Sequence, residues 1–293
     1  MAQQLVNGVF VGSVYALFAL GYTLIFGVLD ILNLAHHAVF MVGAFVALTL
    51  VLVFGLNVLV ALLAAMLVCG LLGLVLDRVA FAPLRRRPDT HFSALISSIA
   101  AGLILEATAL YVYGARVSRF PIGSFPEDAL DLGFATVSAI QVTILVVSVV
   151  LMVALRYVVQ RTRLGLAMRA VAENPRAARL LGVNVDAVIA QSFFISSALG
   201  GAAGVLFGLA FNAISPDVGR SLELKGLAVV IVGGMGSIPG AVVGGFALGL
   251  IEVLSVALTG QSSLRDAIAF ACLFLFLLVR PTGIFGTGGG RAG

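Results

Sequence analysis

Charged residues are missing from long stretches of this chain. No Asp, Glu, Lys or Arg precedes Asp30, and none lies between Asp30 and Asp77. Further uncharged stretches cover residues 132–155, 187–216, 226–251 and 267–279. A helix needs about 20 consecutive apolar residues to cross the hydrocarbon of a bilayer, and several of these stretches reach that length. A helix of a soluble protein would also carry a polar face, which these stretches lack. The pattern therefore predicts an all-α, polytopic membrane protein.

Composition agrees with this prediction. Hydrophobic residues make up 61% of the 293 residues and charged residues only 10%, whereas soluble domains carry about 25% charged residues. Because the N-terminal apolar run lacks a basic region and more spans follow it, we interpret it as a first span and not as a removable secretion signal. Cys69 and Cys272 fall in apolar runs and are interpreted as small core residues, not as metal ligands or a disulfide framework.

The apolar runs predict eight or nine transmembrane helices. They lie near residues 5–27, 33–54, 57–76, 92–113, 137–157, 187–212, 223–236, 238–258 and 264–280. We expect residues 27–37 to form a break inside the membrane, and the short segment 223–236 to be re-entrant. Because of these two irregular segments, the number of transmembrane helices stays open between eight and nine.

The orientation follows from the basic residues, because cytoplasmic loops of membrane proteins are rich in Lys and Arg. We place the larger group in the cytoplasm: Arg78, Arg85, Arg86, Arg87, Arg156, Arg161, Arg163, Arg169, Arg176, Arg179, Arg280 and Arg291. The smaller group then lies outside: Arg116, Arg119, Arg220, Lys225 and Arg265. With nine segments the N-terminus would also lie outside. The net charge of +4 is thus an orientation signal facing a lipid bilayer, and we expect no binding of nucleic acid.

Two polar loops interrupt what we interpret as a single transmembrane domain, residues 1–293. The loop at 114–136 is predicted to be extracytoplasmic, and the loop at 158–186 to be cytoplasmic. Little other polar sequence remains, and the phosphate-binding motif G-x-x-x-x-G-K-[ST] is absent from the sequence. We therefore expect no cofactor on this chain and place any ATP hydrolysis on other polypeptides.

The cytoplasmic loop has the pattern of two short helices. One apolar face is formed at spacings of three and four residues by Leu164, Ala167, Met168 and Val171. A second helix can begin at Pro175, since proline suits a first helical turn, and Gly182 can end it in a left-handed cap. Its small residues would let another protein approach closely. A basic loop lying on anionic lipid is the alternative, and composition alone slightly favours it.

Glycines gather near the C-terminal part of the chain. They are Gly226, Gly233, Gly234, Gly236, Gly240, Gly244, Gly245 and Gly249. Some form the small-x-x-x-small pairs that allow close helix contact. Pro239 and Gly240 interrupt the helix, and non-helical backbone at membrane depth persists only where it is buried or lines a cavity. Tight packing without a role in a pathway is the alternative.

Three ionisable residues fall near membrane depth: His36, Glu106 and Glu252. A charge at the centre of a membrane helix costs about 2.5–3.5 kcal/mol on insertion scales, so each residue invites a functional interpretation. Each also has a structural alternative. His36 and Asn33 can satisfy backbone groups freed at the helix break, and we expect Glu252 to reach water at the outer end of its helix. Glu106 fits structural hydrogen bonding as well as a transport role.

Four sequence blocks resemble the permease subunits of bacterial ABC importers for branched-chain amino acids, and they occur in the same order as in that family. They are Gly21-Tyr-Thr-Leu-Ile-Phe-Gly followed by Asn33-Leu-Ala-His36, the loop from Arg161 to Val185, Gly233-Gly-Met-Gly-Ser-Ile-Pro-Gly-Ala-Val-Val-Gly-Gly245, and Arg280-Pro-Thr-Gly-Ile-Phe-Gly286. Two positions depart from the family pattern. Arg176 stands where an acidic residue is frequent, and His37 stands where we expect glycine.

The resemblance implies a role and partners. The expected partners are a second permease subunit, two ATP-binding subunits and an extracytoplasmic substrate-binding protein, all at a bacterial inner membrane. Leucine, isoleucine and valine are the expected substrates, although urea, short amides and aromatic acids are also associated with the family. ATPase coupling falls on Arg169, Glu173, Arg176, Ala177, Ala178, Arg179 and Gly182. The translocation pathway or helix break falls on Asn33, His36, Gly234, Gly236, Pro239 and Gly240.

Two other classes of function fit the sequence less well. A stand-alone channel or secondary transporter would need internal repeats or a chain of ion-coupling residues at the midplane, and neither is visible in the sequence. An intramembrane enzyme would need a paired nucleophile and base or a cluster of metal ligands, which is also not visible.

Overall fold

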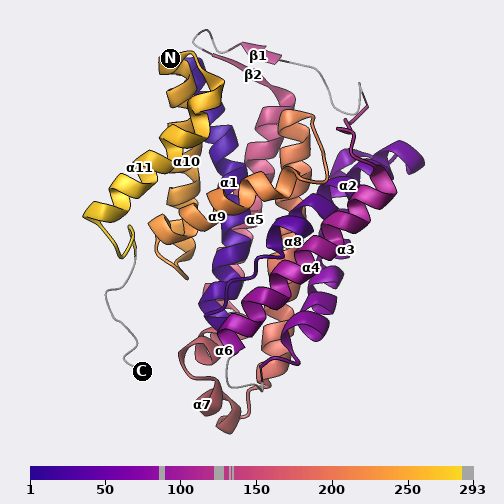
Figure 1. The fold of residues 1–293 in the computed structure, drawn as a ribbon, viewed down its shortest axis with the longest axis vertical. Coiled ribbons are helices and arrows are strands. Elements are labelled where there is room, and N and C mark those ends of the chain that lie inside the picture. Colours follow the sequence, from indigo (N-terminus) through magenta and orange to yellow (C-terminus); the bar gives the residue numbers. More distant parts are fainter. Residues whose placement is uncertain (86–89, 122–128, 132, 134, 286–293) are drawn as a thin grey trace.

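The computed structural model describes residues 1–85, 90–121, 129–131, 133 and 135–285 and is almost entirely helical (Figure 1). Arg86, Arg87, Gly286 and Arg291 lie outside the described residues. The elements, in chain order, are α1 (Ala2–Leu29), α2 (His36–Phe54), α3 (Val58–Leu76), the π-helical turn η1 (Asp77–Phe81), α4 (Thr90–Tyr113), β1 (Ala129–Asp131), β2 (Thr136–Ser138), α5 (Ala139–Arg161), α6 (Arg163–Glu173), α7 (Pro175–Leu180), α8 (Val185–Phe211), α9 (Val218–Gly233), α10 (Ile238–Thr259), the 3-10 turn η2 (Ser262–Leu264) and α11 (Arg265–Val279).

Eight helices in the described residues are long and apolar enough to cross a membrane. The predicted all-α, polytopic class is therefore confirmed. The predicted short segment at 223–236 corresponds to α9, a helix of 16 residues that begins before the predicted boundary. Arg220 resembles a loop charge in the sequence, so the predicted segment begins only at residue 223. One small departure is a two-stranded antiparallel pair, β1 with β2, in which Leu130 lies opposite Val137.

Helix α1 forms the centre of the molecule and packs against α8, α9 and α10. Its contact with α10 depends on glycines: a Cβ at Gly249 would collide with the backbone of Gly12, and a Cβ at Gly8 would lie 2.9 Å from the Leu250 side chain. Small residues allow such close approach, which is a main source of attraction between helices in lipid. By contrast, α4 and α11 expose most of their apolar side chains, as expected of helices that contact lipid.

Two breaks interrupt the helical path inside the apolar region. The first follows α1, where Asp30 adopts left-handed backbone angles (φ 57°) and residues 31–35 are non-helical until α2 begins. A helix break therefore lies within the predicted range 27–37, between Leu29 and His36, and its depth in the membrane stays a prediction. The second separates α8 from α9, where Asn212 is left-handed (φ 44°) and Ile214 pairs with Ser118. Helix α9 then crosses α1 obliquely (Figure 1).

The two polar loops lie at opposite ends of the molecule. Helices α6 and α7 form one end, and β1 and β2 lie at the other, beside the N-terminus (Figure 1). Gln3 joins the N-terminus to that second end, because its amide exchanges hydrogen bonds of 3.0 and 2.8 Å with the backbone of Thr136. This arrangement agrees with the predicted relative placement of the loops, while the side that faces the cytoplasm stays a prediction.

One core assignment from the sequence is wrong. Cys69 is buried as expected, but Cys272 is exposed. It lies on α11, whose outer face carries exposed side chains such as Phe274 and Leu275. An apolar run identifies a membrane helix, but it does not tell which of its faces meets protein and which meets lipid.

Candidate functional site

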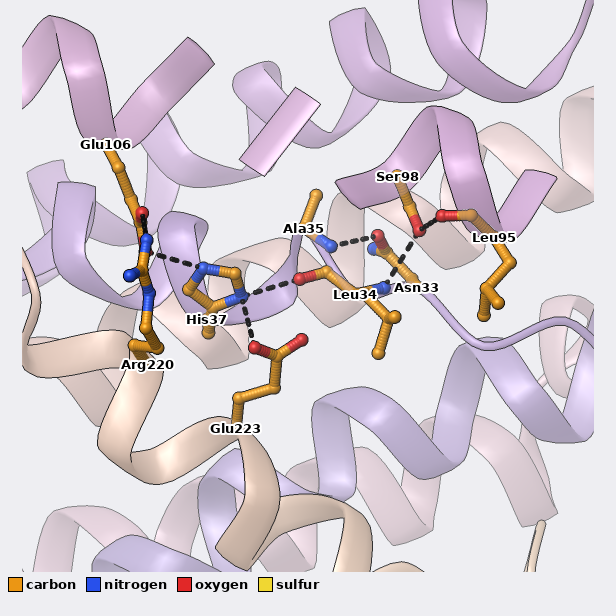
Figure 2. A network of polar contacts seen from close by, with 9 residues as sticks. All are labelled: Asn33, Leu34, Ala35, His37, Leu95, Ser98, Glu106, Arg220 and Glu223. Carbon is orange, nitrogen blue, oxygen red and sulfur yellow. Dashed lines mark hydrogen bonds and ion pairs between the residues drawn. The ribbon is translucent and has the colours of Figure 1, made fainter. Parts of the chain in front are cut away.

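The break between α1 and α2 is held by side-chain hydrogen bonds. Asn33 is buried, and its Oδ1 accepts a bond of 3.1 Å from the Ala35 N–H. The Leu34 N–H donates to Ser98 Oγ of α4 at 3.2 Å (Figure 2). Non-helical backbone survives at membrane depth only when its polar groups find such partners. Asn33 therefore satisfies backbone at the break, as the sequence suggested for Asn33 and His36, and Ser98 supplies the second side-chain partner.

His36 has a different environment. Its ring is buried between Phe18 and Tyr22, with ring centroids 5.1 and 4.8 Å away. A Cβ at Gly21 or Gly200 would collide with the imidazole or press closely on it. These glycines make room for the ring where α1, α2 and α8 meet, so packing accounts for His36 in this structure.

His37 forms the centre of a charged group drawn from α2, α4 and α9 (Figure 2). Its Nε2 lies 2.9 Å from Glu106 Oε1, and its Nδ1 lies 3.3 Å from Glu223 Oε2. Nδ1 also lies 2.6 Å from the Leu34 carbonyl oxygen. The second oxygen of Glu106 pairs with the Arg220 guanidinium. We call His37, Glu106, Arg220 and Glu223 the outer charge cluster.

A second charged group joins α1, α9, α10 and α11. Lys225 Nζ lies 2.7 Å from Glu252 Oε1 and 2.9 Å from Asp266 Oδ1. The Tyr15 hydroxyl donates to Glu252 Oε2 at 2.8 Å. The expectation that Glu252 reaches water is wrong, because its side chain is 0% exposed. Lys225 is likewise buried inside the helical bundle and is no loop charge, which removes it from the residues assigned to the outside.

The glycine-rich turn between α9 and α10 packs within the chain. A Cβ at Gly240 would collide with the Gly233 carbonyl oxygen. Gly234 and Gly236 have φ of 99° and 82°, a region that side chains disfavour. Pro239 lies in the first turn of α10, and Ser237 caps that helix through a bond of 3.2 Å from the Gly240 N–H. Close packing explains the glycines, and a place for this turn at the pathway stays a prediction.

The C-terminal block folds back onto this turn. The Ile284 N–H donates to the Val232 carbonyl at 2.8 Å, and the Phe285 N–H donates to the Gly233 carbonyl at 3.1 Å. Gly283 has φ of 81° and lies against the Gly234 backbone. Two of the sequence blocks that carry the resemblance thus meet in space.

The loop between α5 and α8 forms the two predicted short helices. Met168 and Val171 are buried on the inner face of α6. Asn174 caps α7 by accepting bonds of 3.0 Å from the N–H groups of Arg176 and Ala177. Gly182 follows α7 in the left-handed region (φ 85°), as predicted.

The residues assigned to ATPase coupling differ in exposure. Arg169, Glu173, Arg176, Ala177, Arg179 and Gly182 are exposed. Ala178 is only 2% exposed, because its side chain packs into this chain. Leu180 and Leu181, which were not predicted as site residues, are 89% and 84% exposed at the end of α7. Two adjacent leucines directly before a glycine cap were the available signal. We call Arg176, Ala177, Arg179, Leu180, Leu181 and Gly182 the α7 tip.

Two cavities adjoin this loop. One of about 270 Å³ separates α6 from the glycine-rich turn and is bordered by Met168, Ala172, Gly236 and Pro239 among others. The other, of about 1220 Å³, is lined by four arginines, Arg78, Arg85, Arg176 and Arg179.

Arg85 in the larger cavity connects η1 with the start of α8. It pairs with Asp77 and lies 3.2 Å from Asp186. Burial lowers the pKa of its guanidinium. The two carboxylates help to hold this desolvated charge at the base of the loop.

Residues 4–277 match the family model described as the permease component of branched-chain amino acid transport systems. This chain belongs to that permease family. The permease BraD of Pseudomonas aeruginosa is 37% identical over 97% of this chain and 95% of the relative. The permease LivH of Escherichia coli K12 is 36% identical over the same shares. A probable LivH permease of Methanocaldococcus jannaschii is 30% identical over 94% of this chain and 89% of the relative.

The family resemblance drawn from the motifs is therefore confirmed, and the chain is a multi-pass permease component of a transport system. The permease brings Asn33 and His36 to one helix break, and Gly234 to Gly240 to one turn. The turn lies beside Gly27, at the C-terminal end of α1 just before the break. The group formed by His37, Arg220 and Glu223 was not predicted from the sequence. Two charges one helical turn apart inside α9 were the signal for them.

Proposed function

We propose that this chain is the membrane-spanning permease subunit of an ABC importer in a bacterial inner membrane, and that the importer moves leucine, isoleucine, valine or a related amino acid inward. The relatives support this substrate class, since BraD and LivH are named as high-affinity branched-chain amino acid permeases. In this proposal the chain carries no cofactor, and ATP is hydrolysed on partner chains.

The exposed α7 tip is the observation that carries the ATPase assignment. Leu180 and Leu181 project at one end of the molecule, with Arg176 and Arg179 beside them. Exposed apolar side chains rimmed by charge are typical of sites that bind another protein. A partner that buries a leucine gains about 1.5–3 kcal/mol for each side chain. We assign the α7 tip as the surface that docks on an ATP-binding subunit.

The docking surface is separated from the glycine-rich turn by α6 and a small cavity. Helix α7 follows α6 directly, and α6 borders the cavity of about 270 Å³ whose other wall includes Gly236 and Pro239. A movement of α7 driven by ATP would reach α9 and α10 through α6 and α1, because α6 packs against α7 and α1, and α1 packs against α9 and α10. The importer would then alternate between two arrangements whose populations shift with nucleotide.

Three further partners complete the proposal. A second permease subunit, homologous or identical, forms the pathway together with this one. One ATP-binding subunit docks on the α7 tip of each permease subunit. A binding protein delivers the amino acid at the opposite end, which includes the loop at 114–136. Support for a shared pathway comes from α9, where Arg220 is exposed although the helix lies among the membrane spans.

The ATPase assignment is tested by copurification. In the complete complex, Leu180→Ser with Leu181→Ser should weaken retention of the ATP-binding subunits about 30-fold or more, because two buried leucines are lost. Val117→Ser is the matched control, since Val117 is 56% exposed at the opposite end. Normal retention of ATPase by the leucine variant would contradict the assignment.

The transport assignment is tested by uptake. Proteoliposomes that hold the complete complex, with binding protein outside and ATP inside, should accumulate labelled leucine. Isoleucine and valine should compete with it more strongly than urea, acetamide or benzoate. Uptake that needs no ATP but follows an imposed proton gradient would instead identify a secondary transporter.

A further inference from the structure

The two helix breaks meet at one place. Gly219, in the first turn of α9, lies so close to the His37 carbonyl that a Cβ there would collide with it. Helix α9 begins after residues 212–217, and no side chain caps its N-terminus. Discontinuous helices of this kind form substrate sites in many transporters, because their free N–H groups and dipole favour anionic groups.

The outer charge cluster lies at this meeting point, inside the membrane-spanning region. His37 is about 25 Å along α2 from its outer end at Phe54, and Glu106 is about 10 Å along α4 from Tyr113, at 1.5 Å of rise per residue. Even so, the Arg220 side chain is 62% exposed. A guanidinium at this depth is costly against lipid. Its exposed face therefore borders a water-filled path or the second permease subunit.

Two members of the cluster keep unused binding capacity. Among the described residues, Arg220 pairs through one terminal nitrogen with Glu106, which leaves its other guanidinium nitrogens without an ion pair. Glu223 has one ion pair there, at 3.3 Å from a His37 nitrogen that lies closer to the Leu34 carbonyl. By contrast, both oxygens of Glu106 are engaged. Glu106 and His37 thus position the cluster, while Arg220 and Glu223 remain able to bind a ligand.

The spacing of these two residues suits a particular ligand. Arg220 and Glu223 are three positions apart on α9, so they lie on the same side of the helix with Cβ atoms about 5–6 Å apart. One offers donors in a planar fork that matches a carboxylate, and the other offers acceptors for an ammonium group. Leu224, beside Glu223, is 63% exposed and apolar.

We propose that Arg220 and Glu223 form a transfer site for zwitterionic α-amino acids on the translocation path. Arg220 and the first-turn N–H groups of α9 bind the α-carboxylate, Glu223 binds the α-ammonium, and Leu224 contacts an aliphatic side chain. This inference rests on the proposed function and assigns particular residues to it. The ligand must carry both charges, since a ligand with only one charge leaves either the free donors of Arg220 or the free acceptors of Glu223 unused.

Substrate protection in the complete complex tests the site without help from the binding protein. A cysteine replaces the exposed Ser221 in a Cys272→Ser background, and Cys69 is buried. The rate of labelling by an impermeant thiol reagent is measured in proteoliposomes. Millimolar leucine should slow it several-fold, whereas 4-methylpentanoate, which lacks the ammonium, and 3-methylbutylamine, which lacks the carboxylate, should not.

Two charge variants and a control sharpen the test. Glu223→Gln and Arg220→Gln should each abolish the protection by leucine and lower ATP-driven leucine uptake about tenfold or more. Arg119→Gln, which changes an exposed arginine of the outer loop, should keep both. Glu223→Gln should keep its melting temperature, since the neighbouring His37 retains Leu34 and Glu106.

Each outcome bears on one claim. If wild-type complex takes up leucine with ATP but leucine does not protect, or the singly charged analogues protect equally, the transfer site is wrong and the importer assignment stands. The site is also wrong if Glu223→Gln loses thermal stability along with uptake, because the residue would then be structural. Absence of ATP-driven uptake by the wild-type complex would overturn the proposed function itself.

Discussion

At the residue scale, Lys225 and Glu252 show how this chain keeps charge inside an apolar bundle. Their side chains lie 2.7 Å apart, and Tyr15 supplies a further hydrogen bond to the carboxylate. A buried ion pair adds little net stability compared with apolar residues of the same size. Removal of one partner is different, because it leaves the other charge buried without compensation.

We therefore expect Lys225→Met to lower the free energy of unfolding by about 3–5 kcal/mol. Adding Glu252→Gln to that variant should restore part of the loss, since a neutral amide needs no counter-ion. Thermal unfolding of the purified protein in detergent gives the comparison. Equal melting temperatures for wild type and Lys225→Met would show that the pair contributes nothing measurable.

The burial of Glu252 could not be predicted from the sequence. Its position near the end of an apolar run suggests access to water. Lys225 resembles a loop charge, because other charged residues precede it closely. Only the packing of α9 against α10 shows that the two residues meet. The uncharged stretches, in contrast, identified the spans correctly, since hydropathy is a local property of the chain.

At the element scale, α7 also combines features that the sequence predicts with one that only the structure shows. Its limits were predictable because Asn174, Pro175 and Gly182 are local start and stop signals. Which face turns inward was not, since a helix of six residues is oriented by its neighbours. Ala177 and Ala178 look alike in the sequence, but Ala177 is exposed and Ala178 is buried.

Tryptophan substitutions at Ala177 and Ala178 should have opposite effects on docking and stability. Ala178→Trp should lower the melting temperature of the permease, because overpacking a filled core costs about 1–3 kcal/mol. Ala177→Trp should leave the melting temperature unchanged and reduce retention of the ATP-binding subunits, because its bulk projects from the α7 tip. Thermal unfolding and copurification, measured on both variants, separate the two effects. Normal ATPase retention by Ala177→Trp would place the docking contact elsewhere.

The turn between α9 and α10 carries a second prediction at this scale. Gly240→Leu should lower the melting temperature as well as transport, because any side chain there collides with the Gly233 carbonyl. Met235→Leu, at an exposed position of the same turn, is the control and should preserve stability. If Gly240→Leu unfolds at the wild-type temperature yet fails to transport, the turn has a role in the pathway beyond packing.

At the scale of the whole molecule, the arrangement of the two ends connects fold with function. Helices α6 and α7 lie at one end, and the N-terminus lies with β2 at the other (Figure 1). The outer charge cluster and the glycine-rich turn are joined by α9, which runs between them. An importer needs such a connection, because energy enters at one end and the substrate enters at the other.

The last prediction concerns which of the two ends of the molecule faces the cytoplasm. Basic residues concentrate in cytoplasmic loops, so the end with Arg169 should face the cytoplasm and the end with Arg116 should face outward; both side chains are exposed. Ser124 and Arg86, which also belong to these loops, lie outside the described residues.

In a Cys272→Ser background, an impermeant thiol reagent added to intact cells should label Arg116→Cys and spare Arg169→Cys. Permeabilised cells should show labelling of both, which controls for local accessibility. Labelling of Arg169→Cys alone in intact cells would invert the topology. The α7 tip could not then dock a cytoplasmic ATPase, since no movement of nucleotide-binding subunits could reach it.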